Sequence, residues 1–413
     1  MTIAIIVMSV LLISQVLSTP VRGNSWDINT LDYNLEVGAG TAIVIDNNNN
    51  PHIIYGDTKN EAMKALAWTG SDWNTEMVEQ LEISDYTFVS LIIDSNDYLH
   101  VAYYDDVNCN IHYGKLTENG WDVEIIADYE RVVGIVSLAL DSNNWPYITY
   151  MATDGQKTLK YTTWTGTSWI SEVIETLDNT SEIAPSIYLD SDDNIHIVYC
   201  HAKFVDYILQ EGNIKHARKE STGWNIEIID NSSFTIPSLV LDSNNQAHVI
   251  YQDEIQTLKY ARHNNNYWNI TSVDENAGLE SSLILDSNDN PHIAYCADNK
   301  LKYAQCVGVW KAEIVDSTAF DVGFISLAID DDGNLHISYF DTLRGDLRYA
   351  SNTSKILAND YPFTNYLLFT AAVVIVLIVG MWYYLKCKKN KNRQNDKIDQ
   401  TNQELSRKPP KEI

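Results

Sequence analysis

The chain contains 413 residues, enough for one large domain or for two to three domains of ordinary size. Aspartate and glutamate number 56 against 28 lysines and arginines, which gives a net charge of −28. Nucleic-acid binding requires a basic surface, so we expect no nucleic-acid partner. Aromatic residues make up 11% of the chain and asparagine is abundant, a composition typical of strands and turns.

The N-terminal segment predicts export from the cell. Residues 3–17 form an apolar run without a charged side chain, and Val16 and Ser18 provide a cleavage site. We expect a signal peptide over residues 1–18, with an uncleaved signal anchor as the alternative, because the usual basic segment is missing. Four Asn-X-Ser/Thr sequons, the glycosylation candidates of an exported chain, occur at Asn179, Asn231, Asn269 and Asn352.

A repeat occupies most of the chain. Seven apolar runs end in an aspartate every 44 to 52 residues, at Asp46, Asp94, Asp141, Asp190, Asp242, Asp286 and Asp330. Each unit has an apolar segment that ends in this aspartate, a segment such as HIAY, a segment such as LKYA, and in most units a segment that begins with Trp. Four antiparallel strands per unit form a propeller blade. The sequence therefore predicts an all-β fold, a seven-bladed β-propeller of four-stranded antiparallel blades over residues 26–350.

The seventh unit lacks its fourth segment, because no Trp follows the LRYA segment at residues 347–350 before the apolar C-terminal stretch. The missing segment is found near the N-terminus, where WDINTLD (residues 26–32) matches WNIEIID (224–230) and WKAEIVD (310–316). We expect residues 26–32 to form the outer strand of the last blade. This N-terminal strand would close the ring and cover an exposed sheet edge.

The segments between the first and second strands, such as DSNDNP at residues 286–291, are rich in turn-forming residues. Their alternating oxygen ligands also suit calcium, and Asp330 and Asp332 are the best-placed candidates. In a calcium loop, however, the closing carboxylate follows eleven residues after the first ligand, and here a strand intervenes. We therefore predict turns, with calcium as the lesser alternative and no other cofactor.

A histidine, or a tyrosine at position 147, begins the HIAY-type segment of all seven units. A zinc site needs three or four ligands close together, whereas these residues belong to separate blades. We expect each histidine to make a structural hydrogen bond.

The units resemble the DSNGNPHIxYxD-type repeats of microbial surface seven-bladed propellers, in the broad sialidase-like (BNR-type) group. The resemblance covers residues 26–350 and implies architecture more than function. Sialidases carry S-x-D-x-G-x-x-W boxes, and none occurs here. They also use three arginines to hold a carboxylate, for which the ring offers Arg131, Arg218, Arg262, Arg344 and Arg348.

A second apolar segment lies near the C-terminus. Residues 366–385, YLLFTAAVVIVLIVGMWYYL, carry no charge and are long enough to cross ~30 Å of hydrocarbon as a helix. The tail, residues 386–413, carries a net charge of +5 and begins with several lysines. We expect a single-pass protein in the cell membrane, with the propeller outside, a linker at residues 351–365 and the tail in the cytoplasm. A buried core helix is the alternative.

The loops after the second and fourth strands share one face of the predicted ring and vary most between units. Because the chain leaves the ring at the opposite face, we expect these loops to point away from the membrane. Binding residues usually lie in such loops. Our candidates are Asp57, Asp105, Asp253, Asp341, Tyr86, Tyr129, Phe204 and Tyr207.

Two functions from different classes fit this layout. The first is a membrane-anchored extracellular binding or adhesion protein that presents this face to a glycan or protein ligand. The second is a cell-surface hydrolase acting on glycan or peptide, with Asp57 and Asp105 as acid and base at ~5–9 Å separation. We expect binding rather than catalysis, because no catalytic motif is present; a purely structural surface-layer role is a third option.

Overall fold

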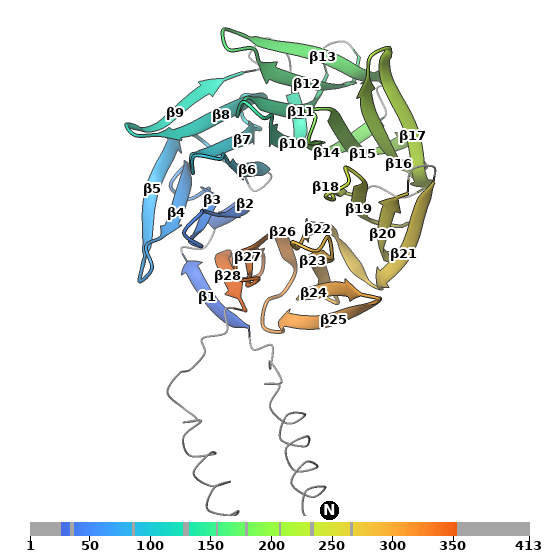
Figure 1. The fold of residues 1–413 in the computed structure, drawn as a ribbon. Coiled ribbons are helices and arrows are strands. Elements are labelled where there is room, and N and C mark those ends of the chain that lie inside the picture. The colour runs from blue at the N-terminus through green and yellow to red at the C-terminus, as the bar shows by residue number, and fades with distance from the viewer. Residues whose placement is uncertain are drawn as a thin grey trace, which may run out of the picture. The chain divides into compact units, whose positions relative to one another are not determined.

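The computed structural model describes residues 26–33, 37–84, 87–126, 132–153, 156–177, 181–205, 208–231, 235–264 and 267–352. Within these ranges, seven four-stranded antiparallel sheets surround a central axis (Figure 1). This arrangement confirms the predicted all-β propeller of seven four-stranded blades. No helix in the described part is long and apolar enough to cross a membrane. The expected signal segment 1–18, membrane helix 366–385 and tail 386–413 lie outside the described residues.

The first four blades follow one another along the chain. The first contains β2 (Val37–Ile45), β3 (Pro51–Asp57), β4 (Ala62–Trp68) and β5 (Trp73–Gln80). The second contains β6 (Val89–Ile93), β7 (Leu99–Asp105), β8 (Asn110–Thr117) and β9 (Gly120–Ile125). The third contains β10 (Val132–Leu140), β11 (Pro146–Ala152), β12 (Thr158–Trp164) and β13 (Trp169–Thr176). The fourth contains β14 (Ser181–Leu189), β15 (Ile195–Val205), β16 (Ile208–Glu220) and β17 (Gly223–Asn231).

The last three blades complete the ring. The fifth contains β18 (Ser238–Leu241), β19 (Ala247–Gln252), β20 (Leu258–His263) and β21 (Trp268–Asp274). The sixth contains β22 (Ala277–Leu285), β23 (Pro291–Ala297), β24 (Lys300–Val307) and β25 (Val309–Asp316). The seventh contains β26 (Val322–Ile329), β27 (Leu335–Asp341), β28 (Asp346–Ser351) and, from the start of the chain, β1 (Asp27–Asp32).

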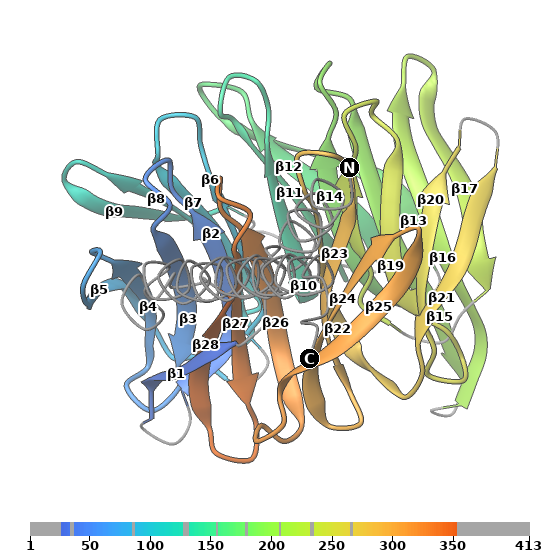
Figure 2. The ribbon, with the colours of Figure 1, turned by 60° about the horizontal axis from the view of Figure 1, so that its bottom comes forward.

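The strands of each blade run between two faces of the ring (Figure 2). We call one the turn face, because it carries the aspartate-led turns between the first and second strands. These turns begin at Asp46, Asp94, Asp141, Asp190, Asp242, Asp286 and Asp330. The other is the hairpin face, which carries the hairpins between second and third strands and the connections from blade to blade.

In the seventh blade, β1 pairs antiparallel with β28, with Asp27 opposite Ser351 and Ile28 opposite Ala350. Trp26, just before β1, also contacts the sixth blade. Its indole Nε1 donates a hydrogen bond of 2.9 Å to Glu313, and its ring lies 5.6 Å from that of Tyr303 in an edge-on arrangement. β1 therefore lies along the outer edge of β28 (Figure 1).

The core lies between neighbouring blades. The tyrosines that end the second-strand motif are fully buried there, at Tyr55, Tyr103, Tyr150, Tyr199, Tyr251, Tyr295 and Tyr339. The Trp that opens an outer strand packs edge-on against an aromatic ring of the preceding blade, as in Trp73–Tyr349, Trp169–Tyr113, Trp224–Tyr161, Trp268–His216 and Trp310–Tyr260. Edge-on aromatic pairs add about 0.5–1.5 kcal/mol each beyond their buried area.

Two rings of hydrogen bonds also join the blades. Near the axis, a serine hydroxyl of one blade accepts from a backbone N–H of a neighbouring blade, as Ser282 does from Leu327 at 3.0 Å. The other serines in this position are Ser90, Ser137, Ser186, Ser238 and Ser326. On the turn face, Asp193 accepts from the N–H and hydroxyl of Ser142, and similar bonds recur at most other junctions.

The recurrent Asp-Ser-Asn segments are turns, as predicted. In the turn that begins at Asp286, one carboxylate oxygen accepts the N–H groups of Asn288 and Asn290 at 2.8 and 2.9 Å. Asp289 adopts a φ of 60°, a left-handed conformation that Asp and Asn tolerate. The turn carboxylate is therefore already used as an internal cap.

The histidines have the structural role that the sequence predicts. His100 lies 3.3 Å from the turn aspartate Asp94 through Nε2, and Nδ1 lies 2.6 Å from the Tyr113 hydroxyl. Burial lowers the pKa of His100 to about 4, so the ring is neutral at neutral pH. A neutral ring donates through one nitrogen and accepts through the other, which fits both partners.

Candidate functional site at the mouth of the central channel

The four predicted acids Asp57, Asp105, Asp253 and Asp341 lie at equivalent places, where the second strand ends on the hairpin face. Each carboxylate accepts hydrogen bonds from backbone N–H groups two to four residues later. Asp57 and Asp341 are fully buried. Because Asp57 and Asp105 each serve their own hairpin, the structure gives no sign of an acid–base pair. Ligand contact by these four acids stays a prediction.

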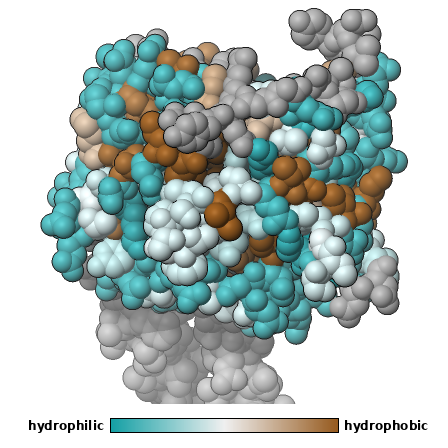
Figure 3. Space-filling model, turned by 90° about the horizontal axis from the view of Figure 1, so that it is seen from above, coloured by the Kyte–Doolittle hydropathy of each residue, from teal (hydrophilic) through white to brown (hydrophobic). Residues whose placement is uncertain are grey.

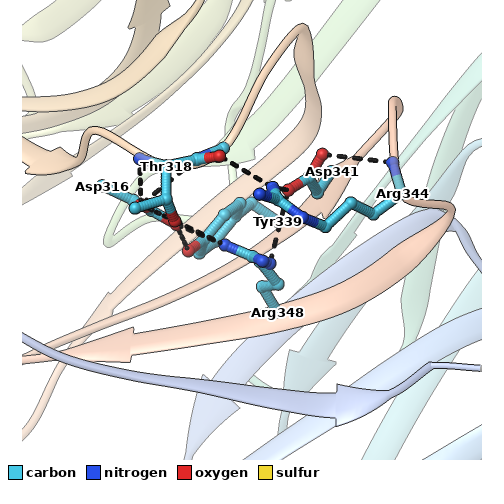
Figure 4. Close-up of polar contacts among 7 residues, drawn as sticks. Asp316, Thr318, Tyr339, Asp341, Arg344 and Arg348 are labelled. Atoms are coloured by element: carbon cyan, nitrogen blue, oxygen red, sulfur yellow. Dashed lines mark hydrogen bonds and ion pairs between the residues drawn. The ribbon is translucent and has the colours of Figure 1, made fainter.

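Asp341 belongs to a polar network that joins the sixth and seventh blades (Figure 4). Asp316 accepts hydrogen bonds of 2.7 Å from Tyr339 and from Arg348, while Arg344 donates to Asp341 at 2.5 Å. Burial alone raises the pKa of Asp316, but hydrogen bonds from Thr318, Tyr339 and Arg348 outweigh it and hold the pKa below its ordinary value. The network is a structural lock between blades.

The same lock recurs around the hairpin face. An acid at the end of one blade's outer strand accepts the hydroxyl of the buried tyrosine in the following blade. The pairs at 2.6–3.0 Å are Asp32–Tyr55, Glu175–Tyr199, Asp230–Tyr251, Asp274–Tyr295 and Asp316–Tyr339. A charge-assisted hydrogen bond of this kind contributes about 1.5–3 kcal/mol.

The described arginines are also engaged with carboxylates. The ion pairs are Arg218–Glu220, Arg262–Asp242, Arg344–Asp341 and Arg348–Asp316. They lie in the fourth, fifth and seventh blades, and Arg131 is outside the described residues. The described arginines therefore do not gather into the triad that a sialidase-like site requires.

Of the four aromatic candidates, Phe204 is the one that lies within the described residues. Phe204 is half-buried and packs against the cluster between the fourth and fifth blades, beside Cys200 and Leu239. Tyr86, Tyr129 and Tyr207 lie outside the described residues.

Two adjoining cavities open near the axis toward the hairpin face. The first, of about 230 Å³, is the mouth of the central channel and is lined by the inner strands of all seven blades. The second, of about 490 Å³, lies over the fifth, sixth and seventh blades and is lined by Asn276, Asn299, Asp298 and Asp321, among others. Glu280 lines both cavities. We call this pair of cavities the channel mouth.

Glu280 is the chemically distinctive residue of the channel mouth. It accepts a hydrogen bond from the backbone N–H of Phe324 in the next blade. Burial raises the pKa of Glu280 to about 7, and the negative charge of Asp321 contributes in the same direction. Among the described residues, no Lys, Arg or His forms an ion pair with this carboxyl. A carboxyl with a raised pKa in a cavity is a functional-site candidate.

The backbone around Glu280 departs from regular strand geometry. β22 and β26 each carry a bulge at their hairpin-face end, between Ala277 and Ser281 and between Gly323 and Ser326. Phe324 adopts a φ of 49°, which is uncommon for a bulky residue. Its ring lies 5.4 Å from that of Phe88 in the second blade, so two aromatics meet across the mouth. Bulges and strained residues of this kind are common beside binding sites.

Sequence reasoning missed Glu280, although the repeat contains the signal. Glu280 stands six residues before the turn aspartate Asp286. The equivalent residues of the other six units are uncharged and small or apolar, namely Gly40, Phe88, Ile135, Ala184, Ile236 and Phe324. One acid therefore breaks an otherwise apolar ring.

The predicted calcium candidates lie on the turn face. Asp330 accepts hydrogen bonds from the backbone and side chain of Asn334 at 2.7 and 2.8 Å, and lies 3.3 Å from His336. Asp332 is exposed. In the described part of the chain, no cluster of three or more His, Cys, Asp or Glu side chains could hold a metal ion. Calcium binding at this turn stays a prediction.

The sequon asparagines differ in how exposed they are. Asn231 and Asn269 are exposed on the outer strands β17 and β21. Asn352 is half-buried, and its side-chain oxygen accepts the N–H of Leu335 at 2.6 Å. Asn179 lies outside the described residues.

No protein-family model matches the chain, and no curated protein matches it by sequence. Many solved structures match its fold. A polysaccharide lyase, ulvan lyase, aligns with a TM-score of 0.54 and 13% identity over 80% of this chain and 98% of its own. Virginiamycin B lyase from Staphylococcus aureus aligns with a TM-score of 0.51 and 12% identity over 79% of this chain and 99% of its own.

A lectin from Aleuria aurantia is a more distant match, with a TM-score of 0.48 and 11% identity over 68% of this chain and 98% of its own. At such identities the likeness extends to the propeller fold alone. A propeller of this kind is compatible with ligand binding, and the fold by itself does not identify a function.

Proposed function

We propose that the protein is a membrane-anchored extracellular binding protein that presents the hairpin face of its propeller to a glycan or protein ligand. The export signal at residues 1–18, the uncharged segment 366–385 and the basic tail that follows support this location. Exposed sequons at Asn231 and Asn269 are consistent with an exported, glycosylated ring. β1 closes the ring in this proposal, so the ring's chain ends, Trp26 and Asn352, both lie on the turn face.

The binding site in this proposal is the channel mouth. A linker attached at the turn face would leave the hairpin face free to meet ligands. Asn276, Asn299, Asp298 and Asp321 supply hydrogen-bonding groups around the larger cavity. Cavities of several hundred Å³ with a few convergent polar groups are the usual form of a ligand site.

Glu280 is the single observation that carries the proposal. Its carboxyl lies at the boundary of both cavities, beside a second acid and without a described cationic partner. A ligand ammonium group would supply the missing positive charge. The Phe88 and Phe324 rings offer faces for a cation–π contact at the same place. We therefore propose a ligand with an amine, such as an amino-sugar unit of a glycan or a lysine of a protein.

Binding to full-length protein in detergent tests this proposal. The probes are amino-sugar oligosaccharides and lysine-containing peptides, each compared with its N-acetylated form. Because the pKa of Glu280 is about 7, the carboxylate forms as pH rises. Affinity for the lysine-containing peptides, whose ammonium group stays charged in this range, should therefore increase several-fold between about pH 5.5 and 8. Glu280→Gln should remove this increase.

Asp72→Asn is the matched control, because it makes the same charge change at an exposed turn between β4 and β5. Equal binding of amine and N-acetyl probes, or a pH response that persists in Glu280→Gln, would refute the site. The location is tested separately by protease treatment of intact cells. A tag on the tail should survive while the ring is digested; loss of the tag instead would refute the proposed orientation.

A further inference from the structure

Two neighbouring turns depart from the repeat at the same position. The residue four places after the turn aspartate is Asn or Gln in five units, at Asn50, Asn194, Gln246, Asn290 and Asn334. In four of these units the Asn side chain donates a hydrogen bond to the turn aspartate. The second and third blades have Tyr98 and Trp145 instead. Both turns keep their backbone bonds, because the N–H groups of Tyr98 and Trp145 still donate to Asp94 and Asp141 at 2.9 and 2.8 Å.

These two aromatics line one cleft between the second and third blades, at the outer part of the turn face. The cleft has a volume of about 420 Å³. Trp145, Trp164 and Trp169 come from the third blade, and Tyr98 comes from the second. The second blade also contributes Lys115, Asp122 and Glu124. We call this the aromatic cleft.

The aromatic rings are held in place by their surroundings. Trp164 and Trp169 pair across a hairpin, with their ring centroids 5.7 Å apart and their planes inclined at 60°. Trp145 lies over Gly166, where an added Cβ would come within 3.3 Å of the indole ring. Although packed on this side, Trp145 is 39% exposed, which is unusual for the largest apolar side chain. The cleft therefore presents a preformed aromatic wall.

A hydrogen bond that joins neighbouring blades at other junctions is absent from this junction. The indole N–H of the outer-strand Trp usually donates to the residue three places after the equivalent Trp of the preceding blade. The bonds are Trp224–Glu172, Trp268–Glu227, Trp310–Thr271 and Trp26–Glu313, at 2.9–3.1 Å. For Trp169 the equivalent acceptor is Glu124, but the buried Nε1 of Trp169 has no hydrogen-bond partner. The buried Nε1 of Trp121 also lacks a hydrogen-bond partner. Only at the junction of the second and third blades, however, do both neighbouring turns carry an aromatic residue, Tyr98 and Trp145.

The unmade bond leaves a donor and an acceptor on the same cleft wall. The N–H of Trp169 lacks an acceptor, and the exposed carboxylate of Glu124 does not fill that role. A hydroxyl group placed between them could accept from the indole and donate to the carboxylate. A small adjustment of the ring would be needed, because Nε1 itself is buried. Unpaired buried donors are rare, and each one calls for an explanation of this kind.

The chemistry of the whole cleft matches a sugar ring. A pyranose has an apolar face of C–H groups, which stacks on indole rings, and a rim of hydroxyls that both donate and accept. Aromatic walls with a few fixed polar groups are typical of small-ligand sites, and the volume is within their range. Lys115 is already occupied, since it lies 3.6 Å from Asp94 and 5.3 Å from the ring of Tyr98. The exposed acids Asp122 and Glu124 then disfavour an anionic sugar.

We propose that the aromatic cleft binds a neutral or amino-substituted saccharide unit. The sugar stacks on Trp145 and Trp164, and its hydroxyls bind Glu124, Asp122 and the indole N–H of Trp169. Figure 3 shows the molecule from above the view of Figure 1, where hydrophobic side chains form separate groups among hydrophilic ones. The site is distinct from the channel mouth, because it lies on the other face of the ring and shares no residue with it.

Saturation-transfer NMR and tryptophan fluorescence on the full-length protein test this inference. The probes are neutral, amino and uronic-acid oligosaccharides. We expect the neutral or amino class to bind and the uronic acids to bind at least several-fold more weakly. Trp145→Asn should weaken binding about tenfold or more, as expected for loss of a central aromatic contact. This variant restores the residue of the other blades, so its Tm should be unchanged.

Two further variants make the outcome decisive. Glu124→Gln should weaken binding several-fold, while Tyr267→Asn, which removes an aromatic that is 60% exposed on the fifth blade, should have no effect. Glu280→Gln should not change binding of the neutral probes, which lack the amine proposed for the channel mouth, so failure of that proposal can be told apart. No saturation transfer from any neutral or amino probe would overturn the inference. Preference for uronic acids would also overturn it, as would Trp145→Asn altering self-association in ultracentrifugation without altering sugar binding.

Discussion

The turn face and the hairpin face of this ring are built from the same seven units, yet they differ in how strictly the units agree. On the turn face, each repeat aspartate caps its own turn, and side chains accept hydrogen bonds from backbone N–H groups of neighbouring turns. On the hairpin face, the hairpins vary in length, and the inner strands β2, β10, β22 and β26 carry bulges near their start. Where the repeat is kept, polar side chains have hydrogen-bond partners within the ring. Where it is broken, at Glu280 or at Tyr98 and Trp145, polar or aromatic groups are left facing a cavity.

The largest effect is expected from a residue that keeps the repeat. Asp316 is fully buried and accepts from Tyr339 and Arg348. Asp316→Ala would leave the Arg348 charge buried without its main partner, which costs about 3–5 kcal/mol. Urea unfolding of the full-length protein measures this loss. A cost below about 1 kcal/mol would mean that the hairpin-face locks are not structural.

Trp26 tests how the start of the chain contributes to the ring. Trp26→Ala removes the contact with Tyr303 and the hydrogen bond to Glu313, and frees β1 to detach from β28. Because Trp26 is only half-buried, the loss should be about 2–3 kcal/mol, less than for a fully buried Trp. Thermal unfolding compared with Trp145→Asn checks this value. Equal Tm values for the two variants would show that β1 does not stabilise the closed ring.

The stability of the fold should depend on the charge of Glu280. Its folded-state pKa of about 7 lies above the ordinary value of 4.5, so the folded protein holds this proton more tightly than the unfolded chain. The stabilisation is fully present below about pH 4.5 and is lost as pH rises through 7. Glu280→Gln keeps an acceptor for the Phe324 N–H and removes the titration. Relative to wild type, it should be more stable at pH 8, on the order of 1–2 kcal/mol, and equal at pH 4.5. A constant difference between these pH values would contradict the raised pKa.

The sequence was sufficient for the blades because each one repeats the same local rules. Asp286, Asn288 and Asn290 set the turn, and alternation in HIAY sets the strand, so seven copies confirm one another. The candidate site could be predicted from the sequence less completely than the blades. The sequence predicts Asp57 and Asp341 as binding residues from their place in loops, yet their carboxylates accept hydrogen bonds within the hairpins they begin. Whether a carboxylate is consumed depends on partners from the next strand or blade, such as Arg348, which no local pattern contains.

The two exceptions to the repeat are visible in the sequence itself. Glu280 and Trp145 each stand at positions where aligned units agree on another residue type. Comparing units column by column would have found both. What such a comparison cannot supply is the geometry, such as the bulge that brings the N–H of Phe324 to Glu280, or the unmade bond at Trp169. These depend on packing between blades.

The smallest predicted effects come from repairing the two gaps in the hydrogen-bond rings. Near the axis, Ala42 replaces the serine found in the other six blades, so Leu91 of the second blade has no serine hydroxyl opposite its N–H. On the turn face, Gly333 stands where the other units have Asn or Asp, so Ser287 has no side-chain acceptor there. Ala42→Ser and Gly333→Asn should each stabilise the ring by about 0.5–1 kcal/mol, the net value of one hydrogen bond. The left-handed φ of 78° at Gly333 is one that Asn tolerates.

The combined effect of Ala42→Ser and Gly333→Asn tests whether the two hydrogen-bond rings stabilise the propeller independently. The sites lie at different junctions, the first with the second blade and the sixth with the seventh, so their effects should add within about 0.5 kcal/mol. Denaturant unfolding of the two single variants and the double variant measures this directly. Gly333 lines neither the channel mouth nor the aromatic cleft, so Gly333→Asn should leave binding at both sites unchanged. Ala42 lines the channel mouth, so for Ala42→Ser only binding at the aromatic cleft should be unchanged. A stabilised Gly333→Asn variant that lost binding would mean that this gap, and not Glu280 or Trp145, is the functional departure from the repeat.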